Sequence, residues 1–387
     1  MATEKTQESA ARIAPSIDIL GSPESPWIKT AEGRAMMTLA CADGDNIPRV
    51  RNAGKTQKAD GRDIQVMHNG LFVLKDGYQG TWQSKIIEGL KGIHEPQEEK
   101  VFYEVLKRLK PGTNMIELGS WWSYYSMWFL SAVDKSKAYC CEPDTENIAL
   151  GRANARLNNF NENEDIYFFQ YAAGSDDGKK ISFDTLKGES VEVPIRSVDS
   201  IMSQEKIPRL DVLHMDIQGV ELEALRGALL TVKQHKLRFL FVSTHHYSIS
   251  EDPGMHDKCI EFITRNGGHI IAAHTVLESC SGDGLIVASF FPEDKNFVVA
   301  VTPQPTNDSL FRSTEKDLAI LWNAHDSLYR RYQEFEESAS AAAVAAQDEI
   351  NKLSAYIGEL TPLRKHLKRQ IKQRIRRNVK KNKNTKF

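Results

Sequence analysis

Carboxylate, serine and histidine side chains stand at the ends of several apolar runs in this sequence. The first run, "NMIELG", leads into "SWWSYYS", so Glu117, Gly119, Ser120 and Ser123 share one turn with two adjacent tryptophans. A glycine in such a turn lets the backbone approach a ligand closely, and a nearby acid can accept hydrogen bonds from that ligand. The turn could therefore hold a ligand, although for this stretch alone a packed corner is the alternative.

The next two apolar runs end in residues that suit a nucleoside. "KAYCCEP" ends at Glu142, about 25 residues after the first acid, where a carboxylate can chelate two ribose hydroxyls. Glu142 could instead cap a helix, but Asp144 and Thr145 are also able to supply that cap. "IYFFQYAAG" ends in Ala172 and Ala173, whose small side chains would leave room for an adenine.

Four residues are candidates for a general base. Asp216 ends "LDVLHMD", His245 and His246 follow "LRFLFVST", and His94 precedes an amphipathic helix. A carboxylate such as Asp216 could orient a cofactor amino group or act on a substrate hydroxyl, and an imidazole could take a proton. Asp216 could equally begin a helix, and a single histidine is more often structural. The sequence does not choose among the four.

Strand-like apolar runs alternate with helical patterns from His94 onward. This alternation predicts a parallel, doubly wound α/β sheet, and the continuous apolar character of the runs indicates that both faces are covered. The last two runs have no helical pattern between them and should pair antiparallel at one edge. Ligands bind at the carboxyl ends of such strands, so the candidate residues should share one crevice. The seven expected strands are "NMIELG", "KAYCCEP", "IYFFQYAAG", "LDVLHMDI", "LRFLFVST", "HIIAAHT" and "GLIVASF".

Three further stretches carry predictions of their own. "VELEALRGALLTVKQ" reads as a single helix. "KISFDTL" and "VEVPIRSV" are typical of an added hairpin. In "IQVMHNGLFVLKDGYQGTW", Asn-Gly between two apolar runs predicts a second hairpin.

The layout and the residues together favour one cofactor. Seven strands with a terminal antiparallel hairpin form the Rossmann-like layout of class I methyltransferases. The Gly-x-Gly-x-x-Gly loop of dinucleotide enzymes is absent, and no P-loop lysine occurs. A turn with a single glycine, followed by a carboxylate that can bind ribose hydroxyls, therefore favours S-adenosylmethionine over a nicotinamide cofactor. The five cysteines lack metal-site spacing, and we expect no metal.

From about His94 to Phe290 the chain resembles the FkbM family of S-adenosylmethionine-dependent methyltransferases. The most specific part is "RSVDSI" followed by "DVLHMDIQGVELEALRGA", and the other shared blocks are "HEPQEE", "KPGTNMIELGS", "CEPDTENIALGRANARLNN" and "YAAGSDDG". The resemblance implies O-methylation of a hydroxyl, often on a sugar, in glycan or secondary-metabolite synthesis. The residues that match the family motifs are Glu117, Gly119, Glu142, Asp216, Gly219 and Glu221.

The chain departs from the family pattern in its first loop, which usually reads Asp-x-Gly-Ala-Asn-x-Gly. Here a glutamate replaces the aspartate, and Ser123 replaces the last glycine. Trp121 and Trp122 would narrow the loop or stack on a sugar or an adenine. Gln218 stands where the family has a glutamate. A soluble secondary metabolite is the alternative acceptor, and the altered loop also supports a non-catalytic scaffold with the methyltransferase fold.

We expect the chain to be organised in five parts. Apolar and alanine residues recur at spacings of four and three after the α/β region, which predicts a coiled coil and a homo-oligomer. One helix packed back on the domain would give the same pattern. The parts are a disordered N-terminus (1–25), a cap or extension (26–92), the FkbM-like domain (93–300), the coiled-coil helix (312–363) and a basic amphipathic tail (364–387).

The tail carries twelve Lys or Arg and no acid, whereas the other 363 residues carry 38 basic and 52 acidic side chains. Apolar residues four apart between these cations are typical of a helix on an anionic lipid surface. A protein partner is the alternative, and nucleic acid is disfavoured because no stacking aromatics interleave the tail. The sequence has no secretory signal and no apolar run near 20 residues. We therefore expect a cytoplasmic protein in peripheral contact with the inner face of the cytoplasmic membrane.

Overall fold

The computed structural model describes residues 31–184, 190–304, 322, 325–331 and 372. The chain divides into two compact units, Met1–Lys316 and Asp317–Phe387. The predicted disordered segment 1–25 lies outside the described residues, as do nearly all residues of the predicted coiled coil and basic tail. The predicted boundary between 26–92 and 93–300 falls inside the first unit, and the five-part division stays a prediction.

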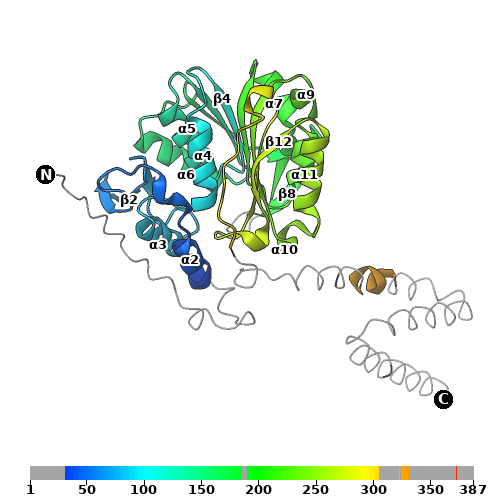
Figure 1. The fold of residues 1–387 in the computed structure, drawn as a ribbon, viewed down its shortest axis with the longest axis horizontal. Helices are drawn as coiled ribbons and strands as arrows, with labels where there is room; N and C mark the ends of the chain where they lie inside the picture. The colour runs from blue at the N-terminus through cyan, green and yellow to red at the C-terminus, as the bar shows by residue number, and fades with distance from the viewer. Residues whose placement is uncertain (1–30, 185–189, 305–321, 323–324, 332–371, 373–387) are drawn as a thin grey trace, which may run out of the picture. The chain divides into compact units, whose positions relative to one another are not determined.

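A seven-stranded sheet lies at the centre of the first unit (Figure 1). Its strand order is β12-β13-β11-β10-β4-β5-β6, and all neighbours are parallel except that β13 runs antiparallel to β11 and β12. This arrangement confirms the predicted class I methyltransferase fold and the antiparallel pairing at one edge. The strands are β4 (Asn114–Leu118), β5 (Lys137–Cys141), β6 (Ile166–Phe169), β10 (Leu210–Met215), β11 (Leu237–Thr244), β12 (His269–His274) and β13 (Gly284–Ser289).

Helices cover both faces of this sheet (Figure 1). Because side chains alternate along a strand, Met115 packs in the core on one face and Ile116 in the core on the other. The first face carries α4 (Pro96–Leu106), α5 (Tyr124–Ala132) and α6 (Thr145–Leu157). The second face carries α7 (Val198–Gln204), α8 (Glu221–Arg226), α9 (Leu229–Lys233) and α11 (Met255–Arg265).

The structure corrects the prediction of a single helix over "VELEALRGALLTVKQ", because α8 and α9 are separate. The carboxylate of Asp199 on α7 accepts hydrogen bonds from the backbone N–H groups of Leu230 (2.9 Å) and Thr231 (2.7 Å). A carboxylate that satisfies two free N–H groups starts a new helix. Between the two helices, Gly227 touches the backbone of Gly174, and a Cβ there would lie 2.3 Å from the Gly174 oxygen.

A second correction concerns "IYFFQYAAG", which is not one strand. Strand β6 ends at Phe169, and β7 (Ala172–Ala173) belongs to a separate three-stranded sheet of order β7-β9-β8. In this sheet β8 (Lys180–Asp184) and β9 (Ser190–Arg196) pair antiparallel, which confirms the added hairpin. Ala172 pairs with Ile195 on β9 and therefore does not stand at the end of a central strand.

The segment before the sheet domain folds into three helical pieces and a small antiparallel sheet. The predicted Asn-Gly hairpin is confirmed, with Ile64 opposite Leu74. Backbone N–H groups of Phe72 and Leu74 donate to the side chains of Asn158 and Asn154, so this sheet is fastened to α6. Figure 1 shows the segment, in blue, at the same end of the sheet as α10 (Tyr247–Ser250), which follows β11. Its elements are α2 (Ala31–Ala40), η2 (Asp43–Asn46), β1 (Thr56–Ala59), β2 (Arg62–Val66), β3 (Phe72–Leu74) and α3 (Thr81–Gly89).

Two short helices complete the described fold. The 3-10 helix η3 (Val276–Glu278) lies in the connection between β12 and β13, and η4 (Pro292–Asp294) follows β13. In η3, Thr275 and Glu278 form a reciprocal capping box. Within the described residues, no helix is long and apolar enough to cross a membrane.

Candidate active site at the carboxyl edge of the sheet

The turn after β4 is wedged between the ends of two neighbouring strands. Gly119 has a φ of +73°, and a Cβ on it would lie 1.8 Å from the backbone oxygen of Asp216. The Gly119 N–H donates to the oxygen of Cys141 at the end of β5 (2.8 Å). Only glycine fits this position, because both the conformation and the contact exclude a side chain.

Ser123 takes the conformation that a glycine would otherwise supply. Its φ of 59° is left-handed, which costs about 1 kcal/mol for a residue with a side chain. Its hydroxyl fits against α6 because residue 151 is glycine, and a Cβ there would lie 2.5 Å from Ser123 Oγ. Ser120 is also buried, and its Oγ has no hydrogen-bond partner among the described residues. The Oγ of Ser123 also lacks a partner among the described residues, so the tightly built turn keeps two hydroxyl groups available.

Glu117 is buried at the end of β4. Its Oε2 accepts from the backbone N–H of Ser126 (3.0 Å), in the first turn of α5. Burial raises the pKa of Glu117 to about 7. The carboxylate thus fastens the start of α5, and its predicted contact with a cofactor amino group stays a prediction.

Glu142 follows β5 and holds the glycine turn from the other side. Its Oε2 accepts from the Trp121 N–H (3.0 Å), and its Oε1 accepts from the Asp144 N–H (3.0 Å) and from Asn147 Nδ2 (3.2 Å). Burial raises the pKa of Glu142 to about 7. Asp144 supplies the cap of α6, since it accepts from the Glu146 N–H (2.7 Å). Oε2 has a single donor and can accept one more bond, as a ribose contact requires.

The two tryptophans of the turn have different surroundings. Trp122 is buried and stacks on Tyr78, with ring centroids 4.5 Å apart and planes 3° apart. Trp122 also stacks on Tyr124 at 5.2 Å. Trp121 is only partly buried and meets Tyr78 edge-on at 5.0 Å. Trp122 therefore braces the turn against the N-terminal segment, whereas Trp121 keeps a surface on which a ligand could stack.

Asp216 and His245 lie together at the carboxyl ends of β10 and β11. His245 Nε2 is 3.1 Å from Asp216 Oδ1 and 3.7 Å from Asp283 Oδ1, and Nδ1 is 2.7 Å from Glu221 Oε1. Burial lowers the pKa of His245, but these three carboxylates outweigh it and hold that pKa well above its usual range. An imidazolium has no free lone pair for a proton, so this geometry favours Asp216 over His245 as the base.

His94 is also surrounded by carboxylates. Its Nδ1 lies 2.6 Å from Glu99 Oε1, and its Nε2 lies 3.2 Å from Glu95 Oε2. Burial lowers the pKa of His94, yet Glu95 and Glu99 raise it to about 10. His94 is therefore a cation that ties down the start of α4. The last candidate, His246, is buried and lies 4.2 Å from the ring of Tyr247, which gives no sign of a proton-transfer role.

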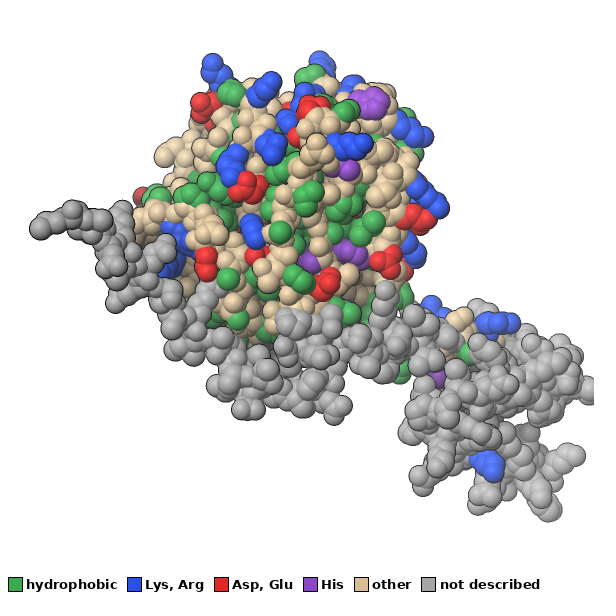
Figure 2. All heavy atoms as spheres, in the orientation of Figure 1, with side chains coloured by type: hydrophobic (Ala, Val, Ile, Leu, Met, Phe, Trp, Pro, Cys, Tyr) green, Lys and Arg blue, Asp and Glu red, His purple; other side chains and the backbone are tan. Residues whose placement is uncertain are grey.

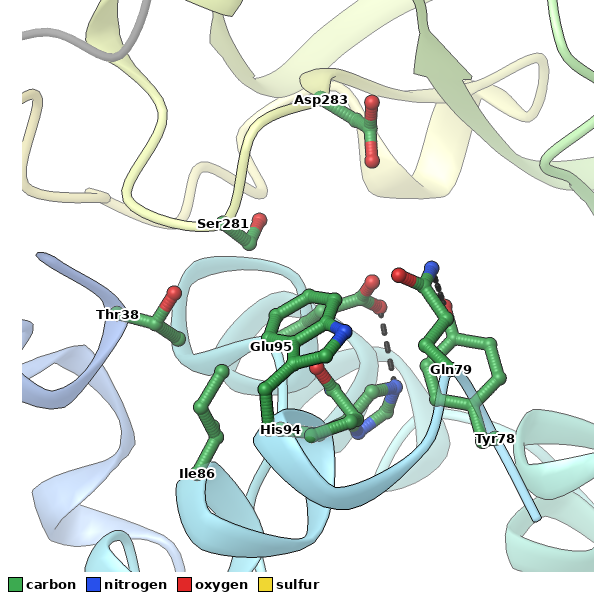
Figure 3. Close-up of a pocket in the computed structure, with 10 residues that line it drawn as sticks. Thr38, Tyr78, Gln79, Ile86, His94, Glu95, Ser281 and Asp283 are labelled. Carbon is green, nitrogen blue, oxygen red and sulfur yellow. Dashed lines mark hydrogen bonds and ion pairs between the residues drawn. The ribbon is translucent and has the colours of Figure 1, made fainter. Parts of the chain in front are cut away.

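A pocket opens beside these residues, between the N-terminal segment and the loop before β13 (Figure 3). The empty space at this place is about 260 Å³, and this figure includes open solvent at the mouth of the pocket. Burial, together with Glu95, Asp216 and Asp283, raises the pKa of Tyr78 in its wall well above the usual range. Asp216 therefore acts on the pocket as well as on the glycine turn. The described lining residues are Thr38, Tyr78, Gln79, Trp82, Gln83, Ile86, His94, Glu95, Ser281 and Asp283.

Sequence reasoning missed Asp283 and most of this pocket. Asp283 has no motif around it, and it reaches His245 only because the loop before β13 folds over the sheet edge. Tyr78, Trp82 and Gln83 belong to the segment with the weakest sequence signals. Within the described part of the chain, no group of three or more His, Cys, Asp or Glu side chains could hold a metal ion.

Comparison with known proteins identifies a domain within the chain. Residues 107–270 match the model of the Methyltransferase FkbM domain. No curated protein matches the chain. Among solved structures, the chain is similar to precorrin-6y C5,15-methyltransferase from Geobacter metallireducens GS-15, with 12% identity, 49% of this chain and 87% of that chain covered, and a TM-score of 0.31. It is also similar to a putative SAM-dependent methyltransferase from Streptococcus mutans, with 11% identity, 60% and 56% covered, and a TM-score of 0.36.

The family match, rather than these distant likenesses, carries the assignment. It spans the glycine turn, the acid after β5 and the Asp216 block. S-adenosylmethionine is the cofactor of such domains, and the residues present fit it: Gly119 leaves space for its approach, while Glu142 and Asp216 follow the two strands that flank β4. When bound, it supplies an electrophilic methyl group on a sulfonium. Residues 107–270 therefore form an S-adenosylmethionine-dependent methyltransferase domain of the FkbM type.

Proposed function

We propose that this chain methylates a hydroxyl of a sugar or glycan. The observation that carries the proposal is the position of Asp216, which contacts the glycine turn through its backbone and has a side chain that is 26% exposed. This side chain shares His245 with Asp283, which lines the pocket. Methyl transfer to a hydroxyl is an in-line displacement that needs alignment and a base. The hydroxyl oxygen forms the new C–O bond as the S–C bond breaks, and Asp216 takes the hydroxyl proton.

The chemistry of the pocket lining supports a carbohydrate acceptor. Tyr78 and Trp82 offer aromatic surface, and Gln79, Gln83 and Ser281 offer polar groups. Sugars are commonly bound by such a mixture, because their C–H faces pack on aromatic rings and their hydroxyls need hydrogen-bond partners. A soluble secondary metabolite with hydroxyl groups is the alternative acceptor within the same reaction class.

One observation favours a non-catalytic scaffold instead. The carboxylate of Glu142 already accepts three hydrogen bonds from the protein, which a purely structural acid would also do. Cofactor binding distinguishes the two functions, because a methyltransferase must bind S-adenosylmethionine and a non-catalytic scaffold has no need to.

Glu142→Ala is expected to remove detectable binding of S-adenosylmethionine, which we expect to be micromolar for the unchanged chain. The variant loses the charge-assisted hydrogen bond to the ribose and also the three bonds that hold the glycine turn and the start of α6, which together should weaken binding by at least roughly 100-fold. Titration calorimetry measures both proteins. Glu146→Ala, which removes an exposed acid in the first turn of α6, is the control and should bind normally. Full binding by Glu142→Ala would exclude the ribose role, and no binding by the unchanged chain would favour the scaffold.

We further propose that the chain forms homo-oligomers through residues 312–363 and contacts anionic membranes through its basic tail. The tail's twelve cations support this, at roughly 1 kcal/mol for each one near the surface. An enzyme held at a membrane would suit a lipid-linked or growing glycan.

Removing residues 364–387 is expected to release the protein from vesicles rich in phosphatidylserine, with binding of S-adenosylmethionine unchanged. Vesicle sedimentation measures the first effect, and calorimetry measures the second. Neutral phosphatidylcholine vesicles, which should bind neither form, are the control. Equal binding of the full and shortened chains to the anionic vesicles would refute the membrane role of the tail.

A further inference from the structure

The wall of the pocket contains one amide side chain that is not bonded to any described residue. Gln83 lines it from α3, and only 4% of this residue is exposed. Its side-chain amide makes no hydrogen bond to any residue in the described part of the chain. The Gln83 amide is absent from the fully enclosed polar atoms that lack a partner among the described residues, so it faces the solvent of the pocket. A ligand hydroxyl that enters the pocket can replace that water as its hydrogen-bond partner.

The charges around the pocket are mostly negative. Glu95 and Asp283 lie in its wall, and Figure 3 shows their carboxyl groups on opposite sides of the cavity. Three further carboxylates stand behind them, those of Glu99, Asp216 and Glu221. Among the described residues, the imidazoliums of His94 and His245 contact this group. The charge of His214, which is itself paired with Glu98, also acts on Glu95 and Asp216.

No lysine or arginine occurs among the described lining residues. Figure 2 shows that many Lys and Arg side chains on the visible face lie along its upper rim, at the end of the domain opposite α10. An excess of carboxylates in a recessed site attracts a cation and repels an anion. A phosphate or carboxylate on the acceptor would meet like charge here, with no basic group to receive it.

We propose that this pocket is the acceptor site and that it selects hydroxyl compounds carrying an ammonium group, as in amino sugars. The ammonium group lies between Glu95 and Asp283, and Gln83 pairs with a hydroxyl. Neutral sugars bind less tightly, and phosphorylated sugars are rejected. This assignment rests on the proposed methyltransferase function and specifies its acceptor.

The test uses the full chain saturated with S-adenosylhomocysteine and three probes: glucosamine, glucose and glucosamine 6-phosphate. Dissociation constants come from ligand-observed NMR titrations. Glucosamine is expected to bind about tenfold more tightly than glucose, and the phosphate should show no binding at the same concentrations. Glucose binding as tightly as glucosamine, tighter binding of the phosphate, or no binding of glucosamine would each overturn the proposal.

Variants of the lining residues test whether the preference for glucosamine over glucose arises in this pocket. Asp283→Asn should reduce the tenfold preference to about twofold, and Asp283→Glu should restore it. Gln83→Met, which keeps the volume but loses the amide, should weaken glucosamine and glucose alike by about fivefold. Glu88→Gln, on the exposed side of the same helix, is the control and should change neither. An unchanged preference in Asp283→Asn would contradict the role of Asp283.

The experiment distinguishes a failure of the methyltransferase function from a failure of the acceptor assignment. If the chain does not bind S-adenosylhomocysteine, the methyltransferase function itself fails. If it binds that nucleoside but shows no preference for the amine, only the acceptor assignment fails. Circular dichroism melts of each variant establish that the fold is intact.

Discussion

Replacing Asp216 with asparagine should lower the rate of methyl transfer by roughly 100- to 10,000-fold, with little change in affinity for S-adenosylmethionine. Asparagine has the same shape but cannot accept the hydroxyl proton. The backbone contact with Gly119 and the packing of β10 do not depend on the carboxylate. This one substitution therefore distinguishes two possible roles of Asp216, that of the general base and that of a cofactor-binding residue.

The measurement is transfer of a labelled methyl group to a panel of sugars and amino sugars, together with calorimetry of cofactor binding. Asp134→Asn, an exposed residue between α5 and β5 at the opposite end of the sheet, serves as the control. If Asp216→Asn loses affinity for S-adenosylmethionine but keeps its turnover rate, Asp216 holds the cofactor and is not the base.

Glu99→Gln should destabilise the fold by about 3–5 kcal/mol at neutral pH, the usual cost of removing one member of a buried ion pair. Glu99 is 0% exposed. Its Oε1 accepts from His94 Nδ1 (2.6 Å) and from the His94 N–H (2.7 Å), and its Oε2 lies 3.5 Å from His68 Nε2. Glutamine keeps the volume of the side chain but leaves the His94 imidazolium with less compensating charge.

The pH dependence of this loss has a defined sign. The pKa of His94 is about 10 in the folded protein, above its usual value of 6.5. A raised pKa adds stability that is fully present below the unfolded value and is lost as the pH rises through the folded value. The difference between the unchanged chain and Glu99→Gln should therefore be largest just below pH 6.5 and should narrow as the pH rises toward 10.

Urea unfolding at several pH values measures both effects. Glu104→Gln, on the same helix but in a surface ion pair with Lys107, is the matched control and should cost less than about 1 kcal/mol. A loss below that level for Glu99→Gln would show that the His94 network does not stabilise the fold.

Much of the sheet could be predicted because each strand and helix is indicated by a pattern within a short stretch of the sequence. Buried parallel strands are continuous apolar runs, and their connecting helices repeat at fixed spacing, so seven strands and their antiparallel edge followed from the sequence. The helix split at Gly227 could not be predicted, since the cap of α9 comes from Asp199, about thirty residues earlier. The placement of Ala172 failed for a similar reason, because its partner Ile195 lies in another sheet.

The sequence by itself determined the fold class, the cofactor and the glycine turn with Asp216 near it, because each depends on residues at strand ends and on short motifs. Only the tertiary structure decided the protonation of the histidines and the shape of the pocket. His94 and His245 read as bases in isolation, but a pKa depends on charges in space, and Asp283 reaches His245 from a distant loop. The packing role of Trp122 was also decided by the tertiary structure, because its stacking partner Tyr78 belongs to the N-terminal segment.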